Sequence, residues 1–138
     1  IGNTAINAGT LKLGSNGSLS SSSVVSIASG AVFDTTAKSS FSIGAAGISI
    51  DVGISGAGFL TANSIVLGNG LSLNMGTTTP LSSYNLWDTS GAVSGNFGTV
   101  NLQGLFTGNL TRANSFSWTG TLGGYNFTLN ENTGNFTL

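Results

Sequence analysis

The chain has 138 residues, of which 39% are hydrophobic and only 5% are charged, and its formal net charge is −1. This length is enough for one domain with a buried core. The hydrophobic content excludes intrinsic disorder, which combines low hydrophobicity with high net charge. Nucleic acid is excluded as a partner because the 3 Lys and Arg residues cannot neutralise the roughly six to ten phosphates of a typical contact.

The first half of the chain predicts short strands and no helix. Good helix formers never gather over a long stretch without an intervening Gly, whereas apolar residues repeatedly alternate with Ser, Asn or Asp,. Glycines mark the ends of these alternating stretches, as turn residues do. In chain order we expect strands at residues 4–7, 10–13, 24–27, 31–33, 41–43, 48–52, 64–67 and 71–75.

The second half of the chain is richer in aromatic residues and predicts longer strands. The only proline, Pro80, lies in the apparent junction at residues 76–81. The end of a stacked coil exposes unpaired backbone and core, so it needs a covering structure. We therefore expect residues 1–76 to form a repeat region and residues 77–138 a capping β region of the same continuous domain. The predicted strands of the capping region are residues 84–88, 97–102, 115–118, 125–129 and 135–138.

The spacing of the strands allows several all-β folds, of which a parallel β-solenoid fits best. Strands recurring about every 7 to 12 residues suit a sandwich, a barrel or a solenoid. Many connections are too short for the crossovers of a sandwich, and few carry hairpin signals, the best being Asn69-Gly70 and Asn16-Gly17,. We predict an all-β parallel β-solenoid or β-helix with an aromatic-rich C-terminal β cap. A β-sandwich is the alternative.

The opening sequence also resembles a known repeat. The stretch "TAINAGTLKLGSNGSLSSSSVVSIASGAVFD", residues 4–34, is similar to the autotransporter-associated β-strand repeat, with its "INAGTLxLG" strand and "GAxFD" ending. Residues 84–102 and 118–138 resemble the closing region of such proteins in the PEP-CTERM exported class, although no sorting signal is present. The resemblance implies a right-handed β-helix exported to the extracellular space or cell surface of a Gram-negative-type bacterium. It transfers no catalytic residue.

The residues offer little for catalysis. The chain has no His and no Cys, which removes imidazole bases and the usual zinc ligands. Its four carboxylates are far apart in sequence, and although stacked turns can align Asp34 with Asp51, turn-capping or solvated roles fit them better,. We predict no catalytic, cofactor-binding or metal-binding residue, and therefore no enzyme. The chain begins with Ile1, which indicates a processed product or an excised fragment.

Two functions remain open. The first is a secreted structural protein that binds copies of itself, even a fibre subunit joined by end stacking or by strand addition. The candidate assembly strands are Thr4, Ala5 and Ile6 near one terminus and Asn135, Phe136, Thr137 and Leu138 at the other. The alternative is an adhesin or carbohydrate-binding module, with Trp87 and Trp118 facing a polysaccharide, although their alternation fits a core face better.

No apolar run approaches the roughly 18 residues of a membrane span.

Overall fold

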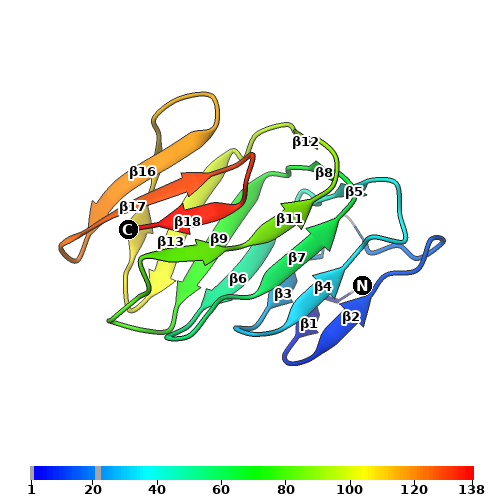
Figure 1. Cartoon of the computed structure of the whole chain (residues 1–138), viewed down its shortest axis with the longest axis horizontal. Coiled ribbons are helices and arrows are strands. Elements are labelled where there is room, and N and C mark those ends of the chain that lie inside the picture. The colour runs from blue at the N-terminus through cyan, green and yellow to red at the C-terminus, as the bar shows by residue number, and fades with distance from the viewer. Residues whose placement is uncertain (1, 21–22) are drawn as a thin grey trace.

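A computed structural model describes residues 2–20 and 23–138, so Ile1 lies outside the described residues. Throughout these residues the chain is all-β and contains no helix. It forms a parallel β-solenoid of about 4 turns, followed by an antiparallel sheet at the C-terminal end (Figure 1). The predicted fold class is confirmed.

Parallel sheets form the sides of the coil, and successive turns pass through them in the same order. Each turn runs along a first sheet, called sheet A, and then crosses to a second, called sheet B. From the second turn on, the chain returns through a short third sheet, called sheet C. Sheet A contains β1 (Thr4–Ile6), β3 (Val25–Ile27), β6 (Ile48–Val52), β9 (Gly70–Met75) and β13 (Thr99–Gly104). Sheet B contains β2 (Thr10–Lys12), β4 (Val32–Asp34), β7 (Phe59–Ala62) and β11 (Trp87–Thr89). Sheet C contains β5 (Phe41–Ser42), β8 (Ile65–Val66) and β12 (Val93–Ser94).

Apolar side chains of successive turns stack in columns inside the coil. Because side chains alternate across a strand, every second residue of each strand points inward, and the in-register pairing places equivalent residues one above the other. The central column of sheet A is Ile6, Ile27, Ile50, Leu73 and Leu102, all of them buried. The facing column of sheet B is Leu11, Phe33, Leu60 and Trp87.

Glycine is required where neighbouring turns come closest. Gly47, just before β6, has a φ of +84°, a left-handed conformation that side chains with a Cβ disfavour. A Cβ built there would lie 2.5 Å from the carbonyl oxygen of Gly70 in the next turn. The tight corner between sheets C and A therefore depends on the missing side chain.

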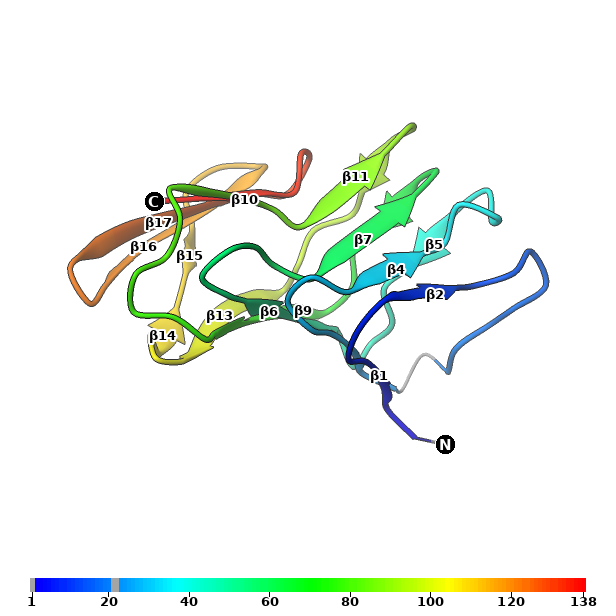
Figure 2. The same cartoon turned by 60° about the horizontal axis from the view of Figure 1, so that its bottom comes forward.

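The C-terminal segment forms the cap. β14 (Gly108–Asn109) pairs antiparallel with the middle of β13, and the chain then crosses to the other layer. There the antiparallel sheet D lies beyond β11 and across from β13 and β14 (Figure 2). Its strands are, in spatial order, β10 (Ser83–Asn85), β18 (Asn135–Thr137), β17 (Tyr125–Asn130), β16 (Ser117–Leu122) and β15 (Thr111–Arg112).

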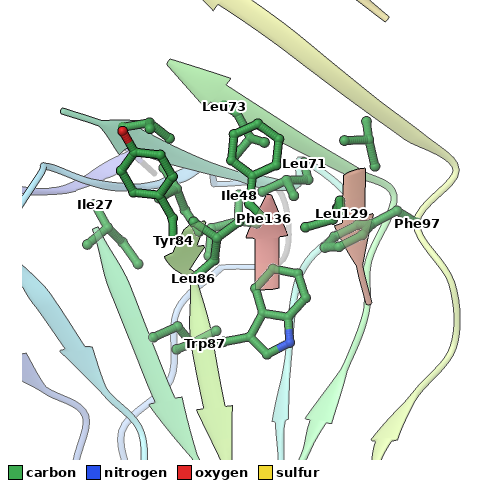
Figure 3. Packing of buried hydrophobic residues seen from close by; sticks show 14 of the residues in the cluster. Ile27, Ile48, Leu71, Leu73, Tyr84, Leu86, Trp87, Phe97, Leu129 and Phe136 are labelled. Carbon is green, nitrogen blue, oxygen red and sulfur yellow. The ribbon is translucent and has the colours of Figure 1, made fainter. Parts of the chain in front are cut away.

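Aromatic rings fill the space between the cap and the last turns of the coil (Figure 3). The rings of Phe127 and Phe136 stack with centroids 5.4 Å apart and an interplanar angle of 5°. Trp87 meets Phe97 edge to face at 5.9 Å, and the ring of Tyr84 lies 6.2 Å from that of Phe136. The larger side chains of the second half of the sequence thus serve to close a wide coil end.

Three features of the chain differ from the expected elements. The coil continues past residue 76, because β11, β12 and β13 pair in parallel with the preceding turn. The stretch 84–88, expected as one strand, divides into β10 in sheet D and β11 in sheet B. β7, β12, β14 (Gly108–Asn109) and β15 (Thr111–Arg112) were not expected, since each is a short strand with little apolar alternation in the sequence.

Candidate functional site

The first candidate assembly strand, Thr4–Ile6, forms β1 at the N-terminal edge of sheet A. In the described part of the chain, it pairs only with β3. The neighbouring edge strand of sheet B, β2, likewise pairs only with β4 among those residues. The first turn of the solenoid therefore presents two strand edges at the same end.

The apolar interior is also open at this end. Leu11 belongs to the inner column of sheet B, whose members Phe33 and Leu60 are fully buried, yet its own side chain is 38% exposed. The reason is positional, since no further turn covers Leu11 within the residues described. We refer to β1, β2 and Leu11 as the open end.

The second candidate assembly strand lies in the middle of a sheet. Asn135, Phe136 and Thr137 form β18, which pairs with β17 on one side and with β10 on the other. Leu138 follows and donates its backbone N–H to Ser82 O at 3.0 Å. Both edges of β18 are occupied, so the expectation that this strand is free to join another subunit is wrong for this structure.

The two tryptophans face the interior of the protein. Trp87 is 1% exposed and Trp118 is 6% exposed. Both donate their indole N–H to Glu131, Trp87 to the backbone oxygen at 3.1 Å and Trp118 to the carboxylate at 2.6 Å. Their burial corrects the idea that they form an exposed platform for sugar rings.

The carboxylate of Glu131 is the centre of a buried polar cluster. Its Oε1 accepts hydrogen bonds from Trp118 Nε1, from Arg112 Nη2 at 2.8 Å and from the backbone N–H of Phe97 at 3.2 Å. Asn96 donates to Oε2 at 3.0 Å in the amide orientation that satisfies its hydrogen-bonding groups,. Residues from the last turn of the coil and from the cap thus meet on one side chain. We call Glu131, Arg112, Trp118 and the Asn96–Phe97 segment the Glu131 cluster.

Arg112 holds the cluster to the backbone around it. Its Nη2 donates to Phe97 O at 3.1 Å and its Nη1 to Ser115 O at 3.2 Å, in addition to the ion pair with Glu131. Its Cζ lies 4.5 Å from the centroid of the Trp118 ring, a distance at which the cation and the ring attract each other. Every partner in this arrangement is part of the chain itself, so the cluster joins cap and coil.

Sequence reasoning missed this cluster. It treated Glu131 as a capping or solvated carboxylate, whereas the side chain is buried. One signal was available: the only Arg and the only Glu of the chain, Arg112 and Glu131, both lie in the aromatic-rich second half. After Asp88 they are the only charged side chains of the sequence, and such a lone pair of opposite charges is a reasonable candidate for a buried ion pair.

The carboxylates weighed for catalysis are not brought together. Asp34 lies in β4, in register with Lys12 and Thr61 of sheet B, whereas Asp51 lies in β6, in register with Asn74 of sheet A. The alignment of Asp34 with Asp51 on neighbouring turns, weighed and judged the poorer fit from the sequence, does not occur. Among the residues described, no group of three or more His, Cys, Asp or Glu side chains lies close enough to hold a metal ion.

Asp34 is held by its own turn. The hydroxyl and the backbone N–H of Thr36 donate to its Oδ1 at 2.6 and 2.9 Å, and Lys12 lies 3.9 Å from its Oδ2. The Thr36 hydrogen bonds, with a smaller attraction from Lys12, lower the pKa of Asp34 below its usual range,. This is the turn-capping role expected from the sequence.

Polar side chains form ladders on the outer face of sheet A. Ser72 Oγ donates to Asn101 Oδ1 at 3.2 Å in the next turn, and Asn74 Nδ2 donates to Asp51 Oδ1 at 3.1 Å in the preceding one. These bonds join side chains of neighbouring turns along the stack. The groups that form them satisfy one another.

Two open clefts of the surface contain charged side chains that are already bonded within the chain. One, of about 390 Å³, lies beside Arg112 and Trp118, whose polar atoms are already bonded within the Glu131 cluster. Another, of about 420 Å³, contains Asp51 and Asn74 of the outer ladder. A helix long and apolar enough to cross a membrane is not found in the described residues.

Comparison of the chain with protein-family models, with curated proteins and with solved structures finds no match.

Proposed function

We propose that the protein is a structural module of the cell surface or extracellular matrix of a Gram-negative-type bacterium. The observation that carries the proposal is that in-register parallel ladders join successive turns of the coil, while its polar and charged side chains bond to one another.

The construction of the chain supports a structural role. Main-chain ladders connect every turn to the next, and the outer side chains of sheet A bond to one another along the stack. The buried charges of the Glu131 cluster are used to attach the cap. The low charge reduces repulsion between copies,, and the resemblance of residues 4–34 to a repeat of exported proteins supports the location.

The proposal names no joining surface. Strand addition at β18 is not part of it, because β17 and β10 occupy both edges of that strand. The carbohydrate-binding alternative depended on exposed Trp87 and Trp118 and loses that support with their burial.

The location is tested by immunogold electron microscopy of the producing bacterium with an antibody against the purified chain. We expect gold particles on the cell surface and in the matrix between cells, and none after deletion of the gene. Labelling confined to the cytoplasm overturns the proposal. Specific binding to a glycan array by the purified chain favours the adhesin alternative instead.

A further inference from the structure

The two Asn-Gly pairs of the sequence lie in different surroundings, and neither closes a hairpin. Asn16-Gly17 belongs to the loop between β2 and β3, whereas Asn69-Gly70 leads directly into β9. The strands on either side of each pair belong to different sheets. We propose that Asn16 is a site of spontaneous deamidation and that the fold protects Asn69 from the same reaction. Such a modification goes beyond the proposed function and does not depend on where the protein works.

The reaction consumes only the chain itself and solvent water. The backbone nitrogen of Gly17 attacks the side-chain carbonyl carbon of Asn16, the Cγ–Nδ2 bond breaks, and ammonia leaves with the proton of the attacking nitrogen. Water then opens the cyclic imide at either of its carbonyl groups, which gives aspartate or isoaspartate. A glycine after the Asn favours the attack, because it has no Cβ in the way and its backbone rotates readily.

The surroundings of Asn16 leave this reaction open. The Asn16 side chain is exposed, and within the described part of the chain no hydrogen bond holds it. The attacking nitrogen is held by one bond inside the turn, from Gly17 N to Gly14 O at 2.9 Å. Moving the Gly17 nitrogen toward the Asn16 side chain therefore breaks one local hydrogen bond and disturbs no sheet.

The backbone at Asn69 is held by the neighbouring turns. Asn69 O accepts from the backbone N–H groups of Gly98 and Thr99, at 2.8 and 3.2 Å. Gly70 is the first residue of β9 and is in register with Thr99 of β13. On the other side, a Cβ built on Gly47 would lie 2.5 Å from Gly70 O. Turning this peptide toward the Asn69 side chain costs the two hydrogen bonds and breaks close packing on both sides.

Lys38 determines the surroundings of the product. Its Nζ donates to the backbone oxygens of Ser15 at 3.3 Å and of Gly17 at 2.8 Å, on either side of Asn16 in the chain. A carboxylate formed at residue 16 therefore arises close to a cation, which favours the charged product. The reaction adds one negative charge to a chain whose formal net charge is −1. Isoaspartate also lengthens the backbone of this turn by a methylene group.

The site is tested by incubating the purified 138-residue chain in mildly alkaline buffer and following it by mass spectrometry. Trypsin cleaves after Lys12 and Lys38, and the resulting peptide 13–38 contains Asn16 as its only Asn. Asn69 lies in the peptide 39–112, where fragmentation locates the modified residue. A sample digested at time zero corrects for reaction during digestion.

We expect the mass increase from amide to carboxylate at Asn16, with both aspartate and isoaspartate formed. Reaction at Asn69 should be slower by about tenfold or more, since two hydrogen bonds to the next turn oppose it.

Two controls separate the effect of the fold from that of the local sequence. In the chain held unfolded in urea, both Asn-Gly pairs are free of the sheets, so their rates should become similar. Gly17→Ala places a methyl group beside the attacking nitrogen and should slow the reaction at Asn16 while leaving Asn69 unchanged. Its Cβ would lie 2.7 Å from Leu13 Cδ1 and 3.1 Å from Gly14 O, which a small movement of the exposed turn relieves. Circular dichroism should show unchanged strand content.

Three results overturn the inference: an Asn16 that stays intact in the folded chain but reacts in urea, equal rates at Asn16 and Asn69 in the folded chain, or an equally fast reaction at Asn16 in Gly17→Ala. None of these touches the immunogold result. Failure of the modification site is therefore distinguishable from failure of the proposed location.

Discussion

The indole nitrogen of Trp118 in β16 donates a hydrogen bond of 2.6 Å to Oε1 of Glu131, which follows β17 in the chain. The same oxygen accepts the backbone N–H of Phe97, just before β13 of the coil. One carboxylate thereby connects the antiparallel cap to the last turn of the parallel stack. Such a buried acceptor with several donors is costly to remove, because each donor then loses its partner.

Replacing Glu131 by Gln should destabilise the fold strongly. The change removes the ion pair with Arg112. The Arg112 cation, whose side chain is only 31% exposed, is then left without its anionic partner. Breaking a buried pair typically costs about 3–5 kcal/mol, and the partial exposure of Arg112 places the expected loss at the lower end. Urea unfolding followed by circular dichroism measures it. Lys12→Ala is the control. It removes the ion pair with Asp34, in which the Lys12 side chain is 63% exposed, and should change the free energy of unfolding by less than about 1 kcal/mol.

Gly134→Ala should weaken the joint between sheets B and D. Gly134 has a φ of +71°, and a Cβ there would lie 2.7 Å from Trp87 O and 2.8 Å from Trp87 N. The left-handed backbone costs about 1–2 kcal/mol with any Cβ, and the clash adds about 1–3 kcal/mol. Gly124→Ala is the matched control, because its φ is +85° but nothing lies within 4 Å of the added atom. Equal losses of unfolding free energy in the two variants would show that the contact with Trp87 is not tight.

Leu60→Ala and Leu11→Ala compare two positions of one column. Leu60 is fully buried between Phe33 and Trp87, whereas Leu11 lies at the open end of the same column and is 38% exposed. A buried Leu→Ala change costs about 2–5 kcal/mol. Leu11→Ala should cost less than half of that, because its side chain is already partly exposed to solvent. Thermal unfolding of both variants at low concentration gives the comparison, and a larger loss at Leu11 would mean that something covers it.

The lowered pKa of Asp34 predicts a small pH dependence with a definite sign. Because the folded-state pKa lies below the unfolded value of about 3.9, the contribution of Asp34 to stability is present above that value. It is lost as the pH falls through the folded-state pKa. Thr36→Ala removes the hydroxyl donor and should raise the pKa of Asp34 more than Lys12→Ala does, since the Thr36 hydroxyl is the largest cause of the shift. Carboxyl-carbon NMR titration of Asp34 tests this order, and a larger effect of Lys12→Ala would reverse the assignment.

Much of the coil was predictable because its physics is local. Alternation of apolar and small polar residues between glycines placed most of the strands of sheets A and B, and stacking of like residues followed from the repeat. β7 escaped because Phe59 and Leu60 are adjacent and give little alternation. The division of residues 84–88 escaped because β10 leaves the coil to pair with β18, a partner distant in sequence.

The site was less predictable than the fold, since its contacts join segments that are far apart. Nothing in the neighbourhood of Glu131 in sequence indicates that Arg112, Trp118 and Phe97 surround it. The burial of Trp87 depends on Phe97 and on the segment around Gly134. The open end, in contrast, follows from the order of the strands once the coil is known.

The pairing of β10 with β18 has a consequence for how the molecule folds. β10 leaves the coil between β9 and β11, and its strand partner, β18, lies far along the sequence. During synthesis the early turns can stack as they emerge, but the cap cannot close until β18 has been made. Closure of such a long loop is slow, so the cap should form last and set the rate at which newly made chains reach the native state.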